Sequence, residues 1–128
     1  MIDAAPVPEV SGTPAEATEQ ILAVLASRLA NEPVASLALL RSMLTNPEAA
    51  SAASAGIARY EAQIARAIPA GDADLRAAII SAITLGITVS RHLVKSDELA
   101  TADPAHVIEL LRPCVLSLAA RPDHSAPP

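Results

Sequence analysis

The chain has 128 residues, of which 52% are hydrophobic and 1% aromatic, and its formal net charge is −5 at pH 7. A single cysteine excludes a disulfide framework and a multi-cysteine zinc site. The acidic balance argues against a nucleic-acid interface, and the few glycines and the lone aromatic residue argue against a β-sandwich or β-barrel.

The first half of the chain predicts three helices. Thr13-Pro14-Ala15-Glu16 is a capping box with proline at the first helical position, so one helix begins there and ends at Asn31-Glu32-Pro33. A second helix is predicted over residues 33–45, with leucines recurring on one face. Asn46-Pro47-Glu48 supplies the N-cap of a third helix that reaches about Ala67.

The second half predicts two further helices and a short turn. Asp72 is expected to cap a helix over residues 73–95, and a single turn is expected at residues 96–99. Asp103-Pro104 begins the last helix, which runs to about Ala120. Pro113 lies inside that helix and predicts a kink near residues 109–112, because proline lacks the N–H that would bond the preceding turn.

These elements define the predicted organisation of the chain. The fold class is all-α, with five helices in one bundle. The stretches outside the helices are rich in proline and show no apolar periodicity, so they are predicted to lack regular structure. The predicted parts are a flexible arm (1–12), a helical domain (13–120) and a disordered tail (121–128).

The helix predicted over residues 73–95 is apolar nearly all round, and small residues recur along it at every fourth position. A helix of this kind must be covered on all sides, either by a central position in the bundle or by a second subunit. The last helix offers a matching apolar surface. We therefore predict a homodimer with a four-helix interface. Its expected residues are Ala78, Ala82, Gly86, Ser90, Val107, Leu111, Cys114, Val115 and Leu118.

Four stretches, in this order and spacing, resemble the C-terminal ligand-binding and dimerisation domain of TetR-family transcriptional regulators. They are ALLRSMLTNPEAA (38–50), DLRAA (74–78), LGI leading to Arg91 (85–91), and ADP followed by a helix that ends Leu-Arg-Pro (102–113). The resemblance spans residues 16–120. Such regulators begin with a three-helix DNA-binding domain, which residues 1–12 are too short to supply. The resemblance therefore implies a five-helix dimeric bundle that binds a small hydrophobic effector, without DNA binding by this chain.

The resemblance also implies a largely apolar pocket among the first four helices, with a few polar groups. Tyr60 is the only ring that could contact a ligand, and Arg41 is a further polar candidate. Met43 can equally be core filler, and Thr84 can bond to its own helix. The implied pocket residues are Leu40, Met43, Leu44, Ile57, Tyr60, Ile64, Ile80, Thr84 and Ile87.

Two other hypotheses remain open at this stage. The scaffold could be an enzyme acting on a small hydrophobic natural-product intermediate, with Tyr60, His92, Arg91 and Glu61 as candidate catalytic residues. Alternatively, the chain could heterodimerise with a full-length TetR-type regulator and modulate it. His92 is expected to cap the end of its own helix or to meet its two-fold mate at the dimer edge.

No cofactor or metal is predicted. The pair His106 and Glu109 is spaced to share one helix face, which is half of a metal site but more typical of an ordinary surface pair. The N-terminus lacks a signal peptide, and the uncharged apolar run over residues 77–90 is too short to span a bilayer. The predicted location is the cytoplasm.

Overall fold

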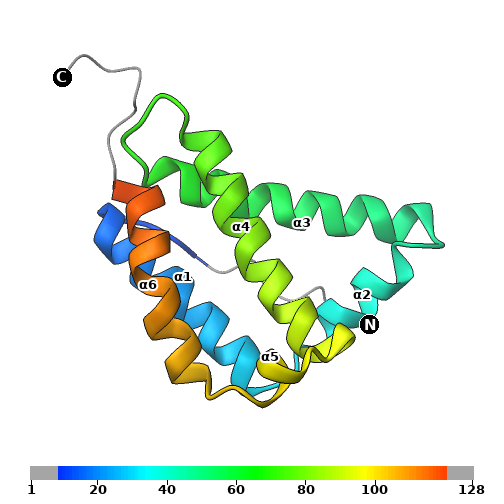
Figure 1. The fold of residues 1–128 in the computed structure, drawn as a ribbon. Helices are drawn as coiled ribbons and strands as arrows, with labels where there is room; N and C mark the ends of the chain where they lie inside the picture. Colours follow the sequence, from blue (N-terminus) through cyan, green and yellow to red (C-terminus); the bar gives the residue numbers. More distant parts are fainter. Residues whose placement is uncertain (1–8, 121–128) are drawn as a thin grey trace.

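A computed structural model describes residues 9–120 of the chain. Within them every regular element is helical, which confirms the all-α prediction, and the turn expected at residues 96–99 is the short helix α5. Figure 1 shows α1 and α6 running side by side, with α4 crossing between this pair and α3. The elements are α1 (Pro14–Ala30), α2 (Val34–Ser42), α3 (Pro47–Arg66), α4 (Ala73–Val89), the π-helix η1 (Ser90–Val94), α5 (Asp97–Thr101) and α6 (Pro104–Ala120).

Two of the predicted helix caps are present. The Thr13 hydroxyl accepts a hydrogen bond from the Glu16 N–H at 3.1 Å, and the Glu16 carboxylate accepts one from the Thr13 N–H at 3.1 Å. These bonds hold the pKa of the Glu16 carboxyl below its usual value. The Asn46 side chain likewise accepts from the Glu48 N–H at 2.9 Å. The sequence therefore determines where α1 and α3 begin.

Asp72 is the N-cap residue of α4, as predicted, but its side chain does not bond to the helix end. The side chain instead accepts from Arg76 Nε at 2.7 Å. Arg76 is buried, and its Nη1 also donates to the Leu118 carbonyl of α6 at 3.0 Å. A buried cation needs a counter-charge more than a helix end needs a cap, because exposed N–H groups can bond to water.

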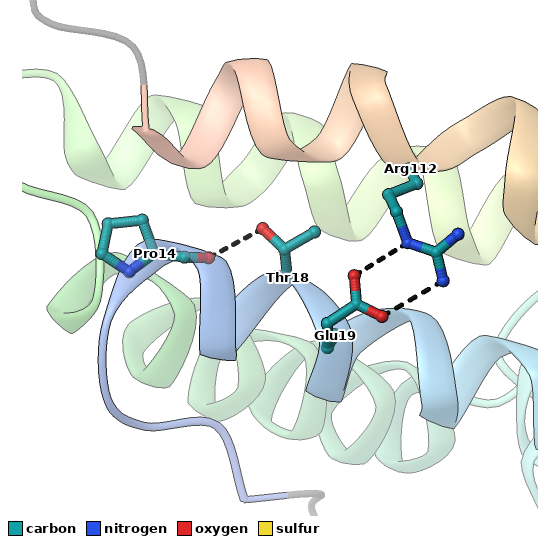
Figure 2. Close-up of polar contacts among 4 residues, drawn as sticks. All are labelled: Pro14, Thr18, Glu19 and Arg112. Carbon is teal, nitrogen blue, oxygen red and sulfur yellow. Dashed lines mark hydrogen bonds and ion pairs between the residues drawn. The ribbon is translucent and has the colours of Figure 1, made fainter.

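The core lies along one face of α1, where Ile21, Leu22, Leu25 and Leu29 are at most 2% exposed. Packed against this face are Tyr60 and Ile64 of α3, Ala77 and Ile80 of α4, and Ile108, Val115 and Ala119 of α6. At the edge of the α1–α6 contact, Arg112 donates to both carboxylate oxygens of Glu19, at 2.8 and 3.1 Å (Figure 2). The same view shows the Thr18 hydroxyl bonded to the Pro14 carbonyl. The bidentate ion pair fixes the register of α6 on α1.

α6 runs as one α-helix from Pro104 to Ala120, with Pro113 inside it. The helix is continuous through Pro113, and the kink predicted near residues 109–112 stays a prediction. Pro113 and Glu109 are both exposed, so the Glu109 carbonyl, which lacks a donor from the proline, faces water. Placing the proline on the solvent side avoids a buried unsatisfied carbonyl.

Residues 9–12, at the end of the arm predicted over residues 1–12, contact the helical domain. Val10 is 6% exposed in the core, and its N–H donates to the Gln63 side chain at 2.8 Å. Gln20 bonds both the N–H and the carbonyl of Ser11, at 2.8 and 3.1 Å. A single apolar residue among prolines carries no periodicity that would reveal such packing. The predictions for residues 1–8 and 121–128 lie outside the described residues.

Candidate functional site

The structure places the implied pocket residues in three kinds of environment. Tyr60 and Ile64 of α3 and Ile80 and Thr84 of α4 are buried where these two helices pack. Leu44 is 84% exposed beyond the end of α2. The side chains at the margin of the packed region are half-buried: Leu40, Met43, Ile57 and Ile87.

Tyr60 is the polar residue at the centre of this region. It is 7% exposed, and its burial raises the pKa of the phenol, while the positive charge of Arg28 lowers it. Within residues 9–120 its hydroxyl makes no hydrogen bond. The Thr84 hydroxyl, by contrast, donates to the Ser81 carbonyl of its own helix at 2.9 Å. Tyr60, not Thr84, therefore has a side-chain donor available for a ligand.

Arg28 lies in the last turn of α1 and was not among the residues singled out from the sequence. It is half-buried, and its guanidinium makes no ion pair or hydrogen bond with any residue in the range 9–120. A basic residue in the last turn of a helix commonly complements the helix dipole, so the sequence pattern alone gives no sign of another role.

His92 of η1 joins the end of α4 to the end of α1. Its Nε2 lies 2.7 Å from the Arg28 carbonyl. A carbonyl can only accept, so Nε2 must carry the proton and donate. The carbonyl is one of the last four of α1, which have no partner within the helix. His92 thus caps α1 instead of its own helix.

The four candidate catalytic residues do not form one hydrogen-bonded group within the described residues. Arg91 donates to the Leu99 and Ala102 carbonyls at 2.7 and 2.8 Å, so its guanidinium is held at α5. His92 is bonded to α1, and Glu61 lies half-buried on α3. Among residues 9–120 there is also no group of three or more His, Cys, Asp or Glu side chains that could hold a metal ion.

An open groove of about 380 Å³ lies between α5 and α6. None of the implied pocket residues lines it, and α1, α3 and α4 supply no lining side chain. The lining residues are Glu98, Leu99, Ala102, His106, Val107, Leu110 and Leu111.

α4 presents an apolar face to solvent. Leu75 and Ile79 are 62% and 40% exposed, and Ala82 and Gly86 continue the same stripe one and two turns further on. A Cβ built on Gly86 would meet nothing within 4 Å, so the surface there is open. The neighbouring face of α6 exposes Leu110, Pro113, Cys114 and Ser117. We call these eight residues the α4/α6 face.

The interface predicted from the sequence overlaps this face only in part. Ala82, Gly86 and Cys114 are exposed on it, while Ala78, Ser90, Val107, Leu111 and Leu118 are half-buried at its margins. Val115 is fully buried in the core and is not available to a partner, because it faces α1. α6 is apolar on two sides, and periodicity cannot tell which side faces α1 and which is exposed.

α4 and η1 together form a helix over Ala73–Val94 that could cross a membrane by length and composition alone. Of its apolar 18-residue stretch, 28% is buried inside the protein. This helix is longer than the uncharged run over residues 77–90, because η1 continues α4 to Val94. A single helix of this kind is weak evidence for a membrane span, because core and interface helices meet the same criterion.

We expect the phenol of Tyr60 to titrate above its ordinary pKa of 10.0, because burial disfavours the phenolate. Arg28→Gln should raise this pKa further, since it removes the nearby positive charge. The proton is bound more tightly in the folded state, so stability is retained below the unfolded pKa and falls as the pH rises above it. Phenolate absorbance measures Tyr60 alone, because the chain has no other tyrosine. A pKa that is unchanged in Arg28→Gln would contradict the expected coupling.

A family model described as the tetracyclin repressor-like C-terminal domain matches residues 15–118, which is most of the chain. No curated protein and no solved structure was found to match. Domains of this family generally dimerise and bind small-molecule ligands, and the regulators that carry them are soluble cytoplasmic proteins. The match covers α1 to α6, including Tyr60 and the α4/α6 face. The chain therefore belongs to the tetracyclin repressor-like C-terminal domain family.

Proposed function

We propose that this chain is a regulatory domain that dimerises through the α4/α6 face and binds a small hydrophobic effector among α1, α2, α3 and α4. The observation that carries the proposal is the apolar face of α4, on which Leu75 and Ile79 are exposed beside the small residues Ala82 and Gly86. Apolar patches of this kind on one side of a domain mark protein interfaces, and small residues let helices approach closely.

Half-buried apolar side chains of α2, α3 and α4 support the effector site. Leu40, Met43, Ile57 and Ile87 lose only part of their surface to the protein, so a bound aliphatic molecule can cover the remainder. Leu40 lies in α2, and Met43 is the C-cap residue of this helix. α2 packs chiefly on α3. A helix with one main neighbour can adjust to a ligand at lower cost than a central helix. Leu44, at 84% exposed, is not included in the proposed pocket.

The α4/α6 face serves equally for pairing with a second copy or with a full-length TetR-type regulator. Its apolar residues are complementary to the same face of another domain of this family. We propose the homodimer as the principal state, in the cytoplasm, and the heterodimer as a regulated alternative.

A series of 1-alkanols of increasing chain length tests the effector site. We expect the melting temperature, followed by circular dichroism, to rise with chain length and then level off when the pocket is filled, because ligands that bind the folded state stabilise it. Met43→Glu should weaken this response, while Leu44→Glu at the neighbouring exposed position should leave it intact. The absence of stabilisation by any alkanol, or equal responses of the two variants, would contradict the proposed pocket.

A further inference from the structure

The two ends of the α4/α6 face differ in shape. At the start of α4, Leu75 and Ile79 project from the helix, with 62% and 40% of their surface exposed. At the start of α6, the groove between α5 and α6 opens beside the face, because Leu110 belongs to both. The groove is lined mainly by aliphatic side chains, with Glu98 and His106 as its polar members. One end of the face therefore carries two protruding aliphatic side chains, and the other end adjoins an apolar recess.

These ends lie on opposite sides of the face because α4 and α6 run in opposite directions. Figure 1 shows the start of α4 beside the end of α6, and the end of α4 beside the start of α6. Arg76 Nη1 donates to the Leu118 carbonyl at 3.0 Å, which fixes how the two helices lie alongside each other. Counted from this bond at about 1.5 Å per residue, Ala82 of α4 lies about level with Pro113 of α6. Both residues are near the middle of the face.

A two-fold axis through the middle of the face exchanges its two ends. Such an axis places the start of one copy's α4 over the start of the other copy's α6. At about 1.5 Å per residue, Leu75 lies about 10 Å from Ala82 along α4. On α6, Val107 of the groove lies about 9 Å from Pro113 toward the opposite end of the face. Because these two distances match, the axis brings Leu75 of each copy over the groove of the other.

We propose that the second copy of this chain fills the groove between α5 and α6, with its Leu75 inserted and its Ile79 covering the edge. The partner is a second copy because domains of this family generally dimerise and the groove continues the α4/α6 face. An aliphatic side chain gains most from burial in an aliphatic recess. The small residues Ala82 and Gly86 let the middle of the two faces approach closely, so that the ends can meet. This inference rests on the proposed dimerisation through the α4/α6 face.

Disulfide cross-linking tests the contact. In a Cys114→Ser background, which removes the only native thiol, Leu75→Cys is combined with a cysteine at one groove position. The three groove variants are His106→Cys, Glu98→Cys and Leu110→Cys. Oxidation should convert at least one of these double variants into a covalent dimer on a non-reducing gel. Within one chain Leu75 lies more than about 12 Å from the groove, and a disulfide needs Cα atoms within about 7 Å, so the bond can form only between copies.

Single variants in the same background are the controls. Leu75→Cys alone and His106→Cys alone should remain single chains on the gel, because a two-fold axis keeps the two copies of each residue at opposite ends of the face. A covalent dimer of Leu75→Cys alone would overturn the proposed arrangement. A ladder of larger species from a double variant would also overturn it, because a ladder indicates head-to-tail contacts that do not close.

Leu75→Ala measures how much the contact stabilises the dimer. We expect the dimer dissociation constant to rise about hundredfold, because the dimer contains the contact twice and uncovering one leucine weakens binding about tenfold. The variant should fold, since Leu75 is exposed in the single chain. Leu44→Ala is the matched control, because Leu44 is 84% exposed beyond the end of α2 and its truncation should leave the dissociation constant unchanged. Sedimentation equilibrium measures both constants.

The outcomes separate this inference from the function on which it rests. If the chain is dimeric but none of the three double variants forms a covalent dimer, the groove contact is wrong while the α4/α6 interface stands. A Leu75→Ala dimer as stable as the wild type leads to the same conclusion. If the wild-type chain is monomeric in sedimentation equilibrium, the proposed dimer and the groove contact both fail.

Discussion

Ala82→Glu is expected to convert the proposed dimer into a monomer. Ala82 lies in the centre of the exposed stripe of α4, between Ile79 and Gly86. In a two-fold interface the substitution introduces one carboxylate on each copy. Both carboxylates then lie in an apolar contact, where neither has a counter-charge. The cost of burying unpaired charges exceeds the stability of most dimers of this size, so dissociation at micromolar concentration should be complete.

Sedimentation equilibrium of the wild type and the variant measures this effect directly. Ala55→Glu is the matched control, because Ala55 is exposed on α3, away from the α4/α6 face, and should leave the dimer intact. The fold should survive Ala82→Glu, since the position is exposed in the single chain. Cys114, the only thiol, should also react faster with a maleimide in the monomeric variant. A dimer that tolerates Ala82→Glu would exclude this face as the interface.

Leu25→Ala is expected to lower the free energy of unfolding by about 2–5 kcal/mol, the range for truncating a fully buried leucine. Leu25 is 1% exposed on the face of α1 that contacts the core of α3, α4 and α6. The loss includes the transfer free energy of the deleted atoms and a cavity that three packed helices cannot close. For a domain of this length, whose total stability is modest, this is a large fraction.

Urea unfolding followed by circular dichroism, at a single protein concentration, checks the size of this effect. Leu44→Ala is the matched control, because Leu44 is 84% exposed and its truncation should change the free energy by no more than about 0.5 kcal/mol. Equal unfolding midpoints for the two variants would show that α1 is not at the centre of the core.

The elements could be predicted from the sequence because their signals are local. The capping box at Thr13 and the Asn46 cap act within one turn, so they locate the starts of α1 and α3 whatever packs against them. The position of Asp72 at the start of α4 was predicted, but not the bond of its side chain to Arg76, which tertiary packing buries against α6. The contacts of residues 9–12 with the helical domain were also not predicted, since Val10 is held by Gln63 of α3, far along the chain.

The candidate site could be predicted only in outline. Tyr60 stood out because it is the only ring, and the apolar stripe of α4 stood out because no charge interrupts it between Arg76 and Arg91. The bond from His92 to the end of α1 and the burial of Val115 depend on how α1 lies against its neighbouring helices. Local patterns determine which residues share a helix face, and tertiary packing alone decides which face meets the core, a partner or a ligand.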